Sequence, residues 1–137
     1  MGLGSKERTF WALMKRNLGP RLRFLERVEN KCGRGWPDVH GVADYGCKPF
    51  WMELKVVTRG NKIRFQPSQP LWISAYPSCV YVATRILKPN VEEAIRIDGG
   101  SRISELVEKG IKARAYALYH KPYDWDQIAE ELKEATR

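Results

Sequence analysis

Two short segments of this chain carry side chains whose types and spacing could do chemistry. The first is Gly35-Trp36-Pro37-Asp38, and the second is the apolar run 50–57, which contains Glu53 and Lys55. In a β-strand, residues i and i+2 point to the same side, so Glu53 and Lys55 would project from one face while the apolar residues between them pack on the other. Buried charges are costly unless they are paired or bound to a metal, so this run predicts a salt bridge or a site.

Asp38 and Glu53 could share one cation. If the strands that carry them are neighbours, their backbones lie about 4.8 Å apart and both carboxylates reach the same point. Such oxygen ligands suit Mg²⁺, and Lys55 beside it could stabilise charge at an attacked phosphate or orient the attacking water. The alternative is that Glu53 and Lys55 form only a surface pair on an edge strand. His40 would share the face of Asp38, where we expect a hydrogen-bonded rather than a catalytic histidine.

A first helix should position a further carboxylate. Ser5 can cap a helix from about Lys6 to Asn17, which Gly19-Pro20 ends. At 100° per residue Glu7 falls in line with the apolar stripe of this helix, so we expect it to head toward the interior. There it could serve a second metal or a metal-bound water. The alternative is a carboxylate that only interacts with the dipole at the helix start.

The other elements follow from apolar periodicity and turn residues. We predict strands at 22–30, 38–43, 50–57, 80–86, 92–97 and 113–119, and helices after Pro67, at 102–109 and at 126–135, the last starting from Asp124. A basic loop at 58–65 joins the strongest strand to the helix that contains Gln69. This order predicts an α/β fold with a mixed central sheet flanked by helices, in one domain with a core at about 5–120 and a C-terminal helix at about 124–136.

Composition narrows the choice of partners. The 137 residues are 43% hydrophobic and carry a formal net charge of +8, which predicts attraction to a polyanion. No apolar stretch suits a membrane helix and no phosphate-binding loop of the motor ATPases is present, so we expect an intracellular, cytoplasmic protein without a membrane or a nucleotide cofactor. The cysteines 32, 47 and 79 form no metal-binding pair, and we expect them to be reduced.

The motifs Gly35-Trp36-Pro37-Asp38, Glu53-Leu54-Lys55 and Gln69-Pro70-Leu71-Trp72, preceded by Glu7-Arg8, resemble the PD-(D/E)XK nuclease superfamily. The resemblance covers roughly residues 5 to 86 and is closest to the VRR-NUC and archaeal-type Holliday-junction resolvase branches. It implies a restriction-endonuclease-like fold in which Asp38, Glu53 and the Leu54 backbone carbonyl bind Mg²⁺ or Mn²⁺ and Lys55 assists the attack of water. Glu7 would correspond to the helix-borne glutamate of those branches. Gln69 corresponds best to their glutamine, with Gln66 as a competitor.

The resemblance implies a Mg²⁺-dependent, structure-selective DNA endonuclease, most closely a Holliday-junction resolvase of DNA recombination and repair. Two symmetric cuts need two active sites, so a homodimer is implied. We expect DNA phosphates to be bound by basic residues beside the site: Arg8, Lys15, Arg16, Arg34, Arg59, Lys62 and Arg64. Two alternatives are a nuclease of the same fold that acts on flaps, ends or linear DNA, and a non-catalytic DNA-binding module.

Overall fold

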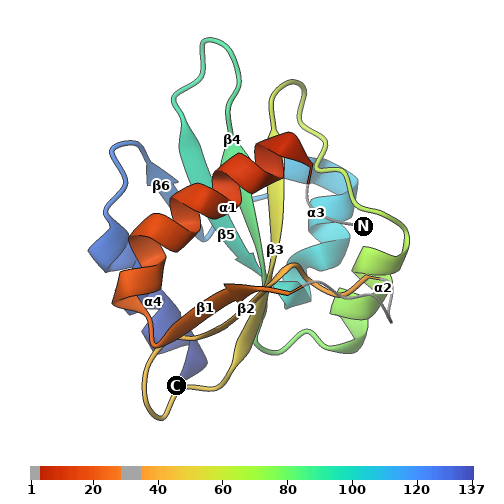
Figure 1. Ribbon diagram of the computed structural model, residues 1–137. Coiled ribbons are helices and arrows are strands. Elements are labelled where there is room, and N and C mark those ends of the chain that lie inside the picture. Colours follow the sequence, from red (N-terminus) through yellow and green to blue (C-terminus); the bar gives the residue numbers. More distant parts are fainter. Residues whose placement is uncertain (1–3, 29–34) are drawn as a thin grey trace.

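Six strands form one mixed sheet in the described residues, 4–28 and 35–137, of the computed structural model (Figure 1). The strands are β1 (Phe24–Arg27), β2 (Val39–Val42), β3 (Phe50–Val57), β4 (Val80–Ile86), β5 (Ala94–Gly99) and β6 (Ala117–His120). Their order in the sheet follows the sequence, and all neighbours are antiparallel except β3 and β4. A parallel pair needs a crossover, and here the crossover contains a helix.

Four α-helices within the same described ranges flank the sheet, so the domain is of the α/β class as predicted. They are α1 (Ser5–Leu18), α2 (Ser68–Ala75), α3 (Ile103–Lys109) and α4 (Trp125–Thr136). Helices α1 and α4 pack on one face of the sheet, and α2 and α3 pack on the other. Helix α2 belongs to the crossover between β3 and β4.

Strand β3 lies between two apolar clusters. On one side, Met52 and Leu54 join the buried residues of α1 and α4, and both side chains are almost fully buried. On the other side, Val57 joins the cluster under α2 and α3. Each fully buried apolar side chain contributes about 1.5–3 kcal/mol of hydrophobic stabilisation. Glu53 alternates with Met52 and Leu54 along β3, so it lies on the other face of the sheet, as the alternation predicts. That face is the one on which α2 packs.

The predicted boundaries of β3 and β4 are confirmed, whereas β6 begins later than the predicted strand 113–119. The reason lies in Arg96, which is 2% exposed. Its guanidinium donates hydrogen bonds to the carbonyl oxygens of Ile111 and Ala113, at 3.1 and 2.8 Å. The backbone before β6 thus satisfies its carbonyls through a side chain and not through a neighbouring strand. Strand β1 is shorter than predicted, and residues 29 and 30 lie outside the described part of the chain.

The two predicted helix caps have opposite outcomes. Asp124 is the N-cap of α4, and its side chain accepts a hydrogen bond from the Gln127 backbone N–H at 3.0 Å. Ser5, however, is the first residue of α1, and Gly4 is the N-cap without a side-chain bond, so the predicted serine cap is wrong. Within the described residues, no helix combines the length and the apolar character that a membrane crossing requires.

Candidate functional site

Strands β2 and β3 are antiparallel neighbours, as the shared-cation hypothesis required. Val39 pairs with Met52, so the register places Asp38, one residue before β2, opposite Glu53. Directly opposed residues of antiparallel strands have Cβ atoms about 4.5–5.5 Å apart. The structure therefore brings the two carboxyl groups of the two sequence motifs together on the α2 face of the sheet.

The two carboxyl groups lie in an environment that disfavours two negative charges. Burial first, and then the charge of Asp38, raise the pKa of Glu53 well above its usual value. Burial also raises the pKa of Asp38, although a shared hydrogen bond with Glu53, the Leu54 backbone N–H and the charge of Lys55 act in the opposite direction. Two ionised carboxylates cannot hydrogen-bond to each other, so this contact needs either a shared proton or a cation.

Apart from the contact between the two carboxyl groups, one oxygen of this pair has no partner. Glu53 is 2% exposed, and its Oε1 atom is buried without a hydrogen-bond donor among the described residues. A buried polar atom without a partner is rare in folded proteins and calls for an explanation such as an ion. When both groups are ionised, this oxygen and the adjacent Asp38 carboxylate form an acceptor-only pair, which supplies the oxygen ligands that a hard divalent cation takes.

Gln69 connects Glu53 to Lys55. Its Nε2 donates to Glu53 Oε2 at 2.9 Å, and its Oε1 accepts from Lys55 Nζ at 2.8 Å. The same Oε1 accepts from the Gln66 backbone N–H at 2.9 Å. Lys55 Nζ lies 3.6 Å from Glu53 Oε2. Of the two glutamines considered from the sequence, Gln69 thus contributes its side chain to the site, whereas Gln66 contributes its backbone.

Gly35, directly before the Trp36-Pro37-Asp38 segment, packs against the start of α2. Gly35 has a φ of +85°, and a Cβ added there would lie 2.2 Å from the Ser68 carbonyl oxygen. Only glycine fits that approach in that conformation. Pro37 is buried directly before Asp38. The positive φ and the missing side chain of Gly35 therefore allow the chain to bring Asp38 beside the helix that carries Gln69.

Glu7 is not brought into this group of side chains. Helix α1 packs on the sheet face opposite to the one that carries Glu53, and no group of three or more potential metal-ligating side chains forms among the described residues. Glu7 is partly buried, and a Cβ added at Gly4 would lie 3.0 Å from its Oε2. The predicted apolar stripe of the helix is confirmed, because Phe10 and Met14 are buried and Glu7 lies in line with them. The catalytic role of Glu7 stays a prediction.

His40 is hydrogen-bonded, as expected. Its Nδ1 lies 3.1 Å from the Phe50 carbonyl oxygen, and its ring lies 4.4 Å from the Trp51 ring. Trp51 and Trp72 also border the site, although neither is predicted from the sequence to be a site residue. Their spacing in the sequence indicates this position. Trp51 is two residues before Glu53 on the same strand and Trp72 is three residues after Gln69 on the same helix, so each shares a face with a site residue.

The predicted DNA-binding residues that the structure describes come from α1 and from the loop that leads to α2. Arg59, Lys62 and Arg64 are exposed on the loop that leads to α2, and the next residue, Phe65, has its ring 5.0 Å from Lys55 Nζ. Arg8 and Arg16 are exposed on α1, and the first turn of this helix contacts the start of the loop, because Lys6 Nζ donates a hydrogen bond to Thr58 Oγ1 at 3.4 Å. Lys15 Nζ contacts Glu26 and the Leu25 carbonyl at 2.7 Å each, and Arg34 lies outside the described residues. Of the cysteines, Cys47 and Cys79 are free and Cys32 lies outside the described ranges.

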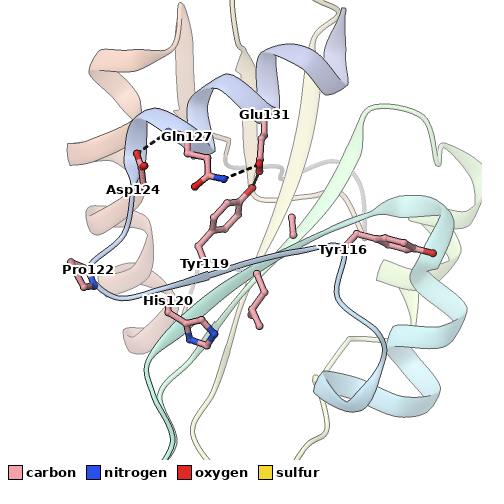
Figure 2. Close-up of a pocket in the computed structure, with 9 residues that line it drawn as sticks. Tyr116, Tyr119, His120, Pro122, Asp124, Gln127 and Glu131 are labelled. Carbon is pink, nitrogen blue, oxygen red and sulfur yellow. Dashed lines mark hydrogen bonds between the residues drawn. The ribbon is translucent and has the colours of Figure 1, made fainter.

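A pocket of about 400 Å³ lies elsewhere, between β6, the loop that follows it and α4 (Figure 2). Figure 2 shows Tyr119 pointing toward Glu131, to which its hydroxyl donates a hydrogen bond. Gln127 Nε2 also donates to Glu131 at 3.2 Å. Since this carboxylate is partnered within the chain, we assign the pocket no part in the site.

Comparisons with protein-family models, with curated proteins and with solved structures found no match for this chain.

Proposed function

We propose that this chain is a metal-dependent endonuclease of the PD-(D/E)XK type that hydrolyses phosphodiester bonds in DNA. The observation that carries the proposal is the buried, opposed pair Asp38 and Glu53 with the unpartnered Glu53 Oε1, held beside Lys55 by Gln69. A pair of this kind costs stability unless something binds it. The pair places two carboxyl groups next to the Lys55 ammonium, and this arrangement suits chemistry at a phosphate.

Asp38, Glu53 and the Leu54 carbonyl would hold Mg²⁺, for which Mn²⁺ could substitute. The residues present fit this ion, because Mg²⁺ takes one or two carboxylates and completes its coordination with waters and substrate phosphate oxygens. The ion would supply Lewis acidity and a bound water of lowered pKa. The unpartnered, buried Glu53 Oε1 supports this assignment independently of any resemblance.

The chain's own groups would position and stabilise the reacting phosphate. Lys55 Nζ is held 2.8 Å from Gln69 Oε1, which fixes its direction and leaves further N–H donors for a phosphate oxygen. In this role its positive charge would stabilise the negative charge that develops on the phosphate when water attacks. Gln69 acts as a positioning residue, because it contacts both Glu53 and Lys55.

The specific form that we propose is a branch-selective enzyme of the Holliday-junction resolvase type, acting as a homodimer inside the cell. The exposed cations Arg59, Lys62 and Arg64 support phosphate binding, which tracks DNA shape and not base sequence. The fold we propose, a restriction-endonuclease-like one, would place this loop beside the cut strand. The competing functions are a nuclease for flaps, ends or linear DNA, and a DNA-binding module without catalysis.

The test compares Mg²⁺-dependent cleavage of a synthetic four-way junction and a linear duplex. We expect cleavage that a chelator abolishes, and a loss of at least about 100-fold in Glu53→Ala and Lys55→Ala, with DNA binding largely retained. The exposed pair Glu108→Ala and Lys109→Ala on α3 provides matched controls, which should cleave normally.

The outcomes separate the candidate functions. Paired nicks on opposed strands of the junction support the resolvase, whereas cutting of linear or flapped DNA alone supports the competing nuclease. Binding without cleavage at any Mg²⁺ or Mn²⁺ concentration supports the binding module. Full activity in both Glu53→Ala and Lys55→Ala would refute the assignment of the site.

A further inference from the structure

A continuous series of aromatic rings borders the carboxylate site. We call it the aromatic surface, and it consists of Phe24, Trp36, His40, Trp51, Trp72 and Tyr76. The rings come from β1, the loop before β2, β2 itself, β3, α2 and the residue that ends α2. No role in the proposed hydrolysis accounts for them.

Each ring of the aromatic surface contacts the next. The ring of Trp36 lies 5.5 Å from that of Trp51 and 5.4 Å from that of Trp72. Tyr76 continues the series at 5.0 Å from Trp72, and His40 continues it on the other side at 4.4 Å from Trp51. These separations are typical of packed aromatic pairs, so the rings support one another as a preformed surface.

The outer rings of this series are exposed and not covered by the fold. Tyr76 is 61% exposed, Phe24 43% and Trp36 41%, whereas large aromatic side chains are highly buried on average in folded proteins. Leu71, on the same helix as Trp72, is 74% exposed. Contiguous exposed apolar surface marks an interaction site more often than scattered single residues do.

The aromatic surface and the basic loop lie at opposite ends of the carboxylate site. Along β3, Lys55, Glu53 and Trp51 occupy successive positions of one face, each about 6.6 Å from the next. Beyond Lys55 lies Phe65, directly after the exposed Arg64 of the basic loop. A linear polymer bound across this face would thus contact first the cations, then the carboxylates and then the aromatic rings.

Charge decides which partner suits this surface. Helix α2 carries no charged side chain, and the loop 58–65 carries cations without an acid. A partner that presents both flat apolar rings and a regular series of negative charges matches both halves. An unpaired nucleic-acid strand has this chemistry, because each base has a face that stacks and each linkage a charge. A paired duplex does not, since its base faces are already stacked.

We infer that the aromatic surface binds unpaired bases of a DNA strand by stacking, next to the phosphate that the site would cut. This inference rests on the proposed nuclease function and adds that the DNA has unpaired nucleotides beside the scissile bond, as flaps, single-stranded ends and junctions opened at the branch point do. Trp36 and Tyr76 are the exposed stacking residues, and Trp51 supports Trp36 from the sheet. Stacking is tolerant of sequence, so the inferred selectivity concerns strandedness.

The experiment measures binding in a chelator, so that it does not depend on cleavage. Fluorescence anisotropy would compare the intact protein on a labelled oligothymidylate and on a blunt duplex of equal length. We expect Trp36→Ala and Tyr76→Ala to weaken binding of the single strand by about 5- to 100-fold for each stacked base lost. Duplex binding and the salt dependence of both should stay unchanged.

Two further variants make the result specific. Tyr116, which is 75% exposed beside β6, provides a matched control, and Tyr116→Ala should bind both DNAs as the unchanged protein does. Trp36→Phe keeps a ring and should restore most of the affinity that Trp36→Ala loses. Quenching of tryptophan fluorescence by the oligonucleotide, lost in the Trp36 variants, is a second readout of stacking.

Three results would overturn the inference. The first is unchanged single-strand affinity in Trp36→Ala and Tyr76→Ala, and the second is an equal loss on single strand and duplex. The third is a homodimer that dissociates when Trp36 is replaced, because the occupant would then be a second copy of the chain. None of these results bears on Mg²⁺-dependent cleavage, which tests the proposed function separately.

Discussion

At the scale of single residues, Glu53 is the side chain that the fold accommodates least well. It is a carboxylate at 2% exposure, it lies opposite Asp38, and one of its oxygens has no donor. Stability alone does not favour a carboxyl group at this position, because its burial costs free energy that the burial of the neighbouring apolar residues of β3 does not. Residues that break local rules in this way are expected at functional sites.

Glu53→Gln should therefore stabilise the metal-free protein. The amide cannot ionise and can donate to Asp38 without the shared proton that the metal-free pair needs, and we expect a gain of about 1 kcal/mol, or roughly 3–5 °C in melting temperature. Thermal unfolding in a chelator measures this effect. The exposed Glu108→Gln is the control and should leave the melting temperature unchanged. A clear loss of stability in Glu53→Gln would mean that the charge is needed by the fold itself.

The same variant also tests the metal site without any measurement of activity. Mg²⁺ at ten times its dissociation constant should raise the free energy of unfolding of the unchanged protein by about 1.4 kcal/mol. Glu53→Gln should lose this increase, because one of the two carboxylates is gone. An equal Mg²⁺ effect in both proteins would place the binding elsewhere.

At the scale of elements, the site depends on how closely the loop before β2 approaches α2. Asp38 comes from that loop, Glu53 from β3 and Gln69 from α2, so three separate elements must meet. Gly35 sets the distance between the loop and the helix, because its position leaves no room for a side chain beside Ser68. This one backbone contact thus controls the geometry of the carboxylates.

Replacement of Gly35 should disrupt both stability and the site. Gly46 offers a matched control, since it also has a positive φ, +79°, but a Cβ there would meet nothing within 4 Å. We expect Gly46→Ala to cost about 1–2 kcal/mol from backbone strain alone, and Gly35→Ala about 1–3 kcal/mol more from the overlap with Ser68. Urea unfolding measures both, and cleavage should fall only in Gly35→Ala. Equal effects of the two changes would contradict this account.

At the scale of the whole molecule, charge is unevenly distributed. The formal net charge is +8, yet α4 and its N-cap carry five acidic residues against Lys133 and Arg137. The loop between β3 and α2 carries cations only. A polyanion should therefore approach the molecule on the side of the basic loop, where long-range attraction steers it toward the site.

The dependence of DNA affinity on salt should report on this loop. If Arg59, Lys62 and Arg64 each contact a phosphate, replacement of all three by alanine lowers the slope of log affinity against log salt by roughly 2.7, at about 0.9 for each contact. Titrations of a duplex at several salt concentrations give the slope. The double variant of Lys133→Ala in α4 and Arg137→Ala directly after α4 should keep the slope unchanged. An unchanged slope in the triple variant would remove the loop from the DNA interface.

The sequence by itself determined the class of fold and the face that each motif occupies. The alternation in β3 placed Glu53 and Lys55 together and away from Met52 and Leu54, because the period of a strand is fixed by its backbone. The cap of α4 at Asp124 followed from local hydrogen-bonding chemistry in the same way. Such features depend on near neighbours in the chain, so the order of residues suffices to predict them.

The tertiary structure decided which of these side chains meet. The sheet separates Glu7 on α1 from the carboxylates, although the phase of Glu7 on its helix was predicted correctly. Gly35 packs against the start of α2, and on this helix the side chain of Gln69 contacts both Glu53 and Lys55. The same helix brings Trp72 beside Trp36. These contacts join residues from separate elements. Their distances depend on the packing of the whole domain, which periodicity within one segment does not encode.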